Sequence, residues 1–170
     1  IRRPTGVPEW IVIYTRAGAG LFGHAGGQLV TRPHDVVLIG PNTGHSYHTD
    51  PDTRKWELLW AHFIPDADWL PFLNWPLLAP GFAKLAITHE RLRQRIVKLF
   101  VELNELMYGY AHHKELLGLN ALEAALLWCD EQNPNAYLRR FDQRVRIAME
   151  FLSSHHTEQI DMAVLAKHCK

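Results

Sequence analysis

The sequence has little cysteine, no long apolar run and no excess of either charge. Its 170 residues include two cysteines, Cys129 and Cys169, which lie far apart and lack the spacing of metal ligands. Secreted domains that depend on disulfides use more cysteine, so we expect free thiols in a reducing cytoplasm. No uninterrupted apolar stretch of about 18 residues is present, and no signal peptide is visible. The sequence therefore predicts neither a membrane span nor export.

The 18 basic and 18 acidic residues cancel, which excludes a protein that binds nucleic acid over its whole surface. Any DNA contact is expected to be local or absent. Hydrophobic residues make up 47% and charged residues 21%, so the chain can bury a core and is not of the disordered class. The chain begins at Ile1 without a methionine and stops at Lys170 within a helical pattern, so we expect both ends to be cut.

Up to Pro65, the pattern is one of short β-branched and aromatic segments separated by turns. Gly26-Gly27 is a hairpin signal, and Pro41-Asn42-Thr43-Gly44 is a second turn. Strands of this length at intervals of roughly 8 to 12 residues indicate a small barrel or sandwich. The predicted strands are residues 9–15, 21–23, 28–30, 35–39, 45–49 and 56–63.

After Pro65 the pattern becomes helical. We expect a short helix over 66–74, then two apolar-striped helices over 88–107 and 114–129. Asn133-Pro134-Asn135 is the best candidate for a linker, since proline ends a helix and its polar neighbours favour turns. Beyond it, residues 142–153 have a helical pattern and Asp161 has the character of an N-cap.

Several segments, in matching order and spacing, resemble the AraC family of bacterial transcription regulators. They are Arg32-Pro33 with Asp35 to Leu38 and Pro41, Leu73-Asn74-Trp75-Pro76, Glu115-Leu116-Leu117 with Asn120, Asp142 to Arg146, and Ile160 to Ala166. The resemblance implies an α+β protein: a cupin-like β-barrel (jelly roll), then a helical dimerisation region and the start of a helix-turn-helix domain. The implied boundaries are 1–132 for the barrel with its dimerisation helices, 133–140 for the linker and 141–170 for the truncated DNA-binding domain.

The implied function is that of a cytoplasmic, ligand-responsive transcription regulator of the activator type, neither an enzyme nor a cofactor protein. Its ligand would be a small sugar, a pentose or related carbohydrate. The helix that enters the major groove would lie beyond Lys170, so we expect DNA to be a partner of the full-length protein but not a specific partner of this chain. The family's amino-terminal arm would precede Ile1.

Transferring the family's sugar site by position gives Arg3, Tyr47 and Trp60, with Leu58 and His45 on the same strand faces. A sugar needs an aromatic plate and a few fixed hydrogen-bonding groups. Arg3 can donate a forked pair of hydrogen bonds to sugar hydroxyls. Trp60 can stack on the sugar ring, and the Tyr47 hydroxyl can form a hydrogen bond to the sugar. The alternatives are that Trp60 and Tyr47 fill the barrel core and that Arg3 is a solvated charge.

Leu58 stands where the family's sugar site has a histidine. The substitution removes a hydrogen bond, so L-arabinose would leave a buried hydroxyl unpaired at a cost of about 1–3 kcal/mol. We therefore expect a less hydroxylated, larger or differently oriented sugar.

A small cupin-type metalloenzyme is the alternative from another class, because five histidines fall in the predicted barrel. His45 and His48 have the wrong spacing for the His-x-His of a metal cupin, and they differ in strand parity. We expect no metal site.

The helix over 114–129 is expected to form a homodimer through Leu116, Leu117, Asn120 and Leu127. One buried amide within an apolar seam fixes the register of a helix pair. The alternative is that this stripe packs inward on the barrel. The basic residues Arg139, Arg140, Arg144 and Arg146 could contact phosphate or form a solvated helix face.

Overall fold

The computed structural model of the chain describes residues 1–24 and 26–136. The chain divides into two units, Ile1–Asn133 and Pro134–Lys170. The expected helix over 142–153, the cap at Asp161 and the basic cluster between Arg139 and Arg146 lie outside the described residues.

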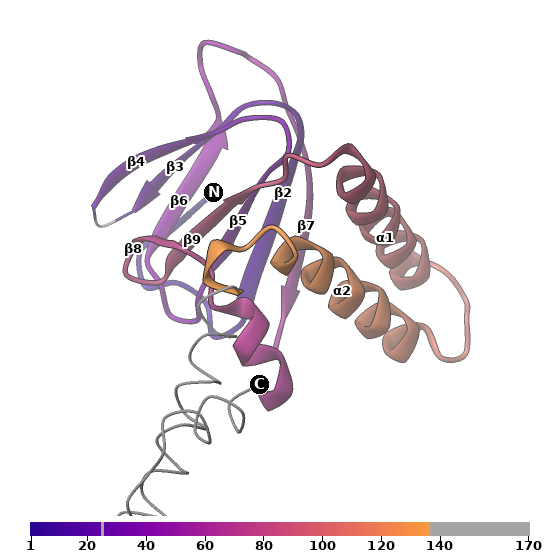
Figure 1. The fold of residues 1–170 in the computed structure, drawn as a ribbon. Coiled ribbons are helices and arrows are strands. Elements are labelled where there is room, and N and C mark those ends of the chain that lie inside the picture. Colours follow the sequence, from indigo (N-terminus) through magenta and orange to yellow (C-terminus); the bar gives the residue numbers. More distant parts are fainter. Residues whose placement is uncertain (25, 137–170) are drawn as a thin grey trace, which may run out of the picture. The chain divides into compact units, whose positions relative to one another are not determined.

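Within the first unit, two antiparallel sheets face each other as in a jelly roll, and a helix pair covers the larger sheet (Figure 1). The four-stranded sheet has the order β1-β6-β3-β4 and the five-stranded sheet the order β7-β2-β5-β9-β8. The mixed helix-and-sheet class predicted from the sequence is confirmed. The strands are β1 (Arg2–Arg3), β2 (Trp10–Gly18), β3 (Gly20–His24), β4 (Gly27–Thr31), β5 (Asp35–Ile39), β6 (His45–Thr49), β7 (Trp56–Phe63), β8 (Leu77–Ala79) and β9 (Phe82–Ala86).

Alternating and β-branched sequence predicted β5, β6 and β7 with the bounds that the structure has. After Pro65 the prediction was purely helical, and there it missed β8 and β9. These strands are short, and β9 forms by pairing with β5 far back in the sequence, in the register Asp35↔Ala86 to Ile39↔Phe82. Such a strand owes its existence to tertiary pairing more than to local preference.

The predicted short helix is the 3-10 helix η1 (Ala67–Leu73), and the two long helices are α1 (Glu90–Tyr108) and α2 (Lys114–Asp130). Two apolar clusters hold the unit together. The helix-side core joins the outer face of the five-stranded sheet to both helices and includes Tyr14, Phe63 and Phe100. The barrel core lies between the two sheets and includes Phe22 and Phe82.

The carboxyl end of α2 is tied to the rest of the unit by hydrogen bonds. The side-chain oxygen of Gln132 accepts from the backbone N–H and the hydroxyl of Thr88, just before α1, at 2.7 and 2.8 Å. Asn133 Nδ2 donates to the carbonyl of Asn74 at 2.9 Å. These bonds fix the helix pair against the barrel.

Candidate functional site

Strand β1 places Arg3 on the inner side of the barrel. Arg3 lies directly opposite His45 of β6, so the two side chains share a face, whereas Arg2 lies opposite Ser46 on the other face. The turn that follows β1 packs closely against the Pro41–Gly44 loop. A Cβ on Gly6 would overlap the backbone of Thr43, and Gly6 has φ +73°, which glycine adopts at least cost.

His45 is a buried histidine with one satisfied ring nitrogen. It is 4% exposed, and its Nδ1 donates to the carbonyl of Thr43 at 2.8 Å. That carbonyl belongs to the turn in which Asn42 adopts a left-handed conformation with φ 56°. Within residues 1–24 and 26–136, Nε2 of His45 has no hydrogen-bond partner. Because burying a polar atom without a partner costs roughly 1–3 kcal/mol, this nitrogen is a candidate ligand contact.

Tyr47 stacks on His45, with ring centroids 5.9 Å apart and planes 7° from parallel. The same phenol ring contacts Phe22 of the barrel core and the edge of Trp56, whose indole N–H donates to the Thr15 hydroxyl at 3.2 Å. Burial raises the pKa of Tyr47, and the nearby Arg3 opposes that rise. Tyr47 therefore belongs partly to the core and partly to the Arg3 neighbourhood.

Strand β7 presents Leu58, Trp60 and His62 on the same side as the barrel core. Their partners on β2 are Thr15, Ile13 and Ile11, and the two isoleucines belong to that core. Leu58 packs against the barrel core, but Trp60 is 58% exposed. The alternative that Trp60 fills a core is therefore not what the structure shows.

His62 on β7 is close enough to Arg3 on β1 and to His45 on β6 for both to affect its pKa. Its pKa is lowered by burial first, then by the charge of Arg3 and by His45, while Glu9 acts in the opposite sense. The Trp60 indole meets the His62 ring edge-on, with centroids 5.4 Å apart. His62 was not predicted as a site residue, although alternation along β7 places it on the same face as Trp60. We refer to Arg3, His45, Tyr47, Leu58, Trp60 and His62 as the inner-face cluster.

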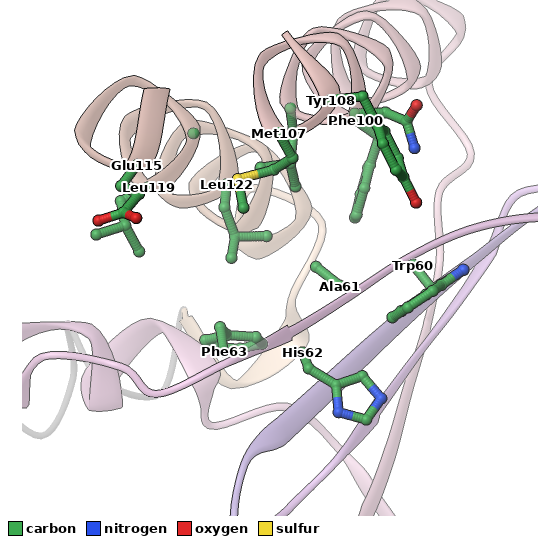
Figure 2. Close-up of a pocket in the computed structure, with 13 residues that line it drawn as sticks. Trp60, Ala61, His62, Phe63, Phe100, Met107, Tyr108, Glu115, Leu119 and Leu122 are labelled. Atoms are coloured by element: carbon green, nitrogen blue, oxygen red, sulfur yellow. The ribbon is translucent and has the colours of Figure 1, made fainter. Parts of the chain in front are cut away.

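A cavity lies on the helix side of β7 (Figure 2). This cavity of about 630 Å³ is bounded by β7 and by both helices, and sequence reasoning did not anticipate it. Met107, Leu119 and Leu122 project into it from the helices, whereas His62 points away from them (Figure 2). Trp60 and His62 line its rim, so the cavity and the inner-face cluster share the edge strand β7.

The four residues expected at a dimer interface lie on the exposed face of α2. Leu116 is 63%, Leu117 45% and Leu127 44% exposed, and Asn120 is exposed as well. The inward face of the same helix is formed by other residues, namely Gly118, Ala121, Leu122, Ala125, Leu126 and Cys129. The alternative in which the predicted stripe packs on the barrel is therefore wrong.

The described residues contain no group of three or more His, Cys, Asp or Glu side chains that could hold a metal ion. None of the helices in that part of the chain is long and apolar enough to cross a membrane.

Comparison with known proteins agrees with the fold and shows the family. The model of the AraC-like ligand binding domain matches residues 1–127. An apo structure of a ToxT variant from Vibrio cholerae has a TM-score of 0.51, with 8% identity over 98% of this chain and 64% of that chain. The likeness to ToxT concerns the fold alone.

Two curated relatives are both described as arabinose operon regulatory proteins. The protein from Escherichia coli K12 is 32% identical over 99% of this chain and 58% of its own length. The protein from Salmonella typhimurium LT2 is 32% identical over 99% of this chain and 60% of its own length. The chain thus spans about three fifths of these relatives, which are transcription regulators and not enzymes. The chain belongs to the family of AraC-like ligand-binding domains.

Proposed function

We propose that this chain is the sensing and dimerising part of a ligand-responsive transcription regulator. A small sugar binds at the inner-face cluster, and two copies associate through the exposed face of α2. Family membership supports the regulator class. The sugar, the contacting residues, the homodimer and a role in DNA binding for the whole protein are parts of the proposal.

One observation supports the sugar site above all others: among the described residues, a buried nitrogen without a partner and a guanidinium without a hydrogen bond or ion pair lie near His62, whose ring packs edge-on against an exposed indole. The Nε2 atom of His45 is buried without a partner in the described part of the chain. Arg3 shares its face across the β1–β6 pair, and Trp60 offers an exposed aromatic surface on the facing strand β7. A sugar has apolar faces that stack on an indole and hydroxyls that satisfy such groups.

A thermal-shift screen across pentoses, hexoses and disaccharides, followed by calorimetry, tests this site. At least one sugar should raise the melting temperature, and Trp60→Leu should weaken its binding by about tenfold or more, a loss of about 1.4 kcal/mol. Tyr110→Leu is the control, because Tyr110 is an exposed aromatic residue that lies between α1 and α2 and not on β7. Unchanged affinity in Trp60→Leu would remove the stacking surface from the proposal.

Dimerisation is proposed through α2 because three exposed residues and the half-buried Ala124 follow a coiled-coil spacing. Positions 117, 120, 124 and 127 are separated by three, four and three residues, which is the seam of a helix pair. The exposed leucines give this face an apolar surface, and contiguous exposed apolar surface is typical of an interaction site. Asn120 would then set the register of the pair.

Analytical ultracentrifugation tests the dimer. The chain should sediment as a dimer at micromolar concentration, and Leu127→Glu should give a monomer, because a charge in an apolar seam is left unpaired. Asn120→Leu should keep or strengthen association while loosening its register. Ile64→Glu serves as the control, since Ile64 is exposed but lies outside α2. A monomeric native chain at micromolar concentration would contradict the proposal.

Regulation requires that the sugar bind one arrangement of the dimer better than another. A ligand with equal affinity for two arrangements shifts neither population, however tightly it binds. The edge strand β7 carries Trp60 and also bounds the helix-side cavity, so a ligand held by Trp60 lies one strand away from the helix pair. This proximity is the reason to expect coupling between the ligand and the dimer.

A further inference from the structure

The inner-face cluster has a positive charge that no carboxylate of the described residues neutralises by contact. The guanidinium of Arg3 makes no hydrogen bond or ion pair within residues 1–24 and 26–136. The ion pairs formed there lie elsewhere, such as Lys84 with Asp35 at 2.7 Å and Lys55 with Glu57 at 2.8 Å. Arg3 is only partly exposed, so water screens its charge incompletely.

Two imidazoles stand beside this guanidinium. His45 is directly opposite Arg3 in the β1–β6 pair, and its Nε2 has no partner in the described part of the chain. His62 projects from β7 on the same inner side, next to Trp60. The acidic group that acts on this neighbourhood is Glu9, which is not paired with Arg3. An arginine with free forked donors and two nearby imidazoles is the side-chain chemistry that recognises a carboxylate.

Leu58 strengthens this interpretation. It occupies the inner face of β7 between Trp56 and Trp60 and packs on the barrel core, so it offers no hydrogen bond to a ring hydroxyl. A neutral sugar bound beside it would satisfy fewer of its hydroxyls. The hydrogen-bonding groups of this neighbourhood are therefore concentrated at Arg3 and His45.

We propose that the ligand of the inner-face cluster is an acidic sugar, with its ring on Trp60 and its carboxylate on Arg3 and His45. This inference rests on the proposed function and narrows the ligand class.

Binding of a carboxylate at His45 has a chemical consequence. Because Nδ1 of His45 donates to the Thr43 carbonyl, Nε2 is an acceptor in the neutral ring, and a carboxylate can bind there only after Nε2 gains a proton. Binding of the acid therefore takes up a proton, whereas a neutral sugar hydroxyl donates to Nε2 directly.

The test is calorimetric titration with sugars that differ only at one carbon, galacturonate against galactose and glucuronate against glucose. At least one uronate should bind about tenfold or more tightly than its neutral partner. Titration of the uronate in buffers of different ionisation enthalpy should show proton uptake on binding, and its affinity should therefore rise as the pH is lowered. A neutral sugar should bind without proton uptake, and its affinity should not rise as the pH is lowered.

Variants of β1 separate the roles of its two arginines. Arg3→Gln should lower uronate affinity by about tenfold or more and abolish the preference over the neutral partner. Arg2→Gln should change neither, because Arg2 lies on the opposite face, across from Ser46. Circular dichroism of both variants shows whether the fold is retained.

Three results would overturn the inference. In the first, galactose or glucose binds as tightly as its uronate and loses affinity in Trp60→Leu. That result would contradict the acidic ligand but would leave the proposed sugar site supported. A uronate preference that survives Arg3→Gln contradicts the assigned contact. If neither uronates nor any sugar of the wider screen binds, the proposed function fails together with this inference.

Discussion

The two faces of strand β7 differ in how they are used. On one face, Ala61 and Phe63 are buried against the helices in the helix-side core. On the other, Trp60 is 58% exposed and His62 lies beside it. Alternate residues of one strand thus join an apolar core beside the helix-side cavity and a group of polar side chains on the barrel side. The difference separates side chains that stabilise the fold from side chains that are free to contact a ligand.

The same contrast appears among the aromatic residues. Tyr14 on the helix-side face is fully buried, and its hydroxyl is paired with His34 Nδ1 at 2.9 Å. Tyr47 on the barrel side is half-buried, and its hydroxyl has no hydrogen-bond partner in the described part of the chain. The Tyr47 hydroxyl is not buried, so it is accessible to water or to a ligand. A paired hydroxyl indicates a structural role, and an unpaired one beside His45 and Arg3 indicates a site.

The largest expected effect is on the free energy of unfolding, which a substitution on the helix side should lower more than a substitution on the barrel side. Phe100→Ala on the helix side should lower the free energy of unfolding by about 3–5 kcal/mol, because it removes a buried aromatic ring and leaves a cavity. Trp60→Ala should cost less than about 1 kcal/mol, because much of the indole is already in water. Urea denaturation of the two variants measures both. Similar losses from the two variants would contradict the distinction between the faces.

A smaller effect is expected at high pH. Burial raises the pKa of Tyr14 from 10.0 to about 12, so the unfolded chain loses this proton before the folded chain does. Stability from this group is therefore present below pH about 10 and is lost as the pH rises toward 12.

The Tyr14→Phe variant isolates this contribution. It should lose about 1 kcal/mol at neutral pH, the usual contribution of one hydrogen bond, and should show a shallower alkaline decline than the native chain. Thermal unfolding over a pH series measures the decline. Tyr47→Phe is the comparison on the barrel side, where the hydroxyl has no partner to lose, and it should cost less at neutral pH. A decline of the same steepness in native chain and Tyr14→Phe would refute the assignment to Tyr14.

Much of the fold follows from local pattern, and its failures have physical causes. Alternation in β6 and β7 fixed their bounds and the shared faces of His45 with Tyr47 and of Leu58 with Trp60. The strands β8 and β9 were missed because β9 depends on pairing with β5 and β8 depends on pairing with β9, and no local pattern contains the long-range pairing.

The limits of sequence reasoning about the site are of the same kind. On α2, Leu116 and Leu122 are equally apolar, so sequence alone left open which face meets the barrel until the exposure of Leu116 decided it. Nor could sequence reveal that Nε2 of His45 lacks a partner, because that depends on the carbonyl of Thr43 and on the packing of β1 across from it.

The most direct test of the account is the ¹⁵N chemical shift of His45 Nε2, measured with and without a saturating sugar or uronate found by the screen. The account predicts a free acceptor nitrogen in the unliganded chain and a large shift on binding, toward a hydrogen-bonded acceptor for a neutral sugar or a protonated nitrogen for an acid. A resonance that does not move when the ligand saturates the protein would contradict the claim that this corner of the barrel is the ligand site.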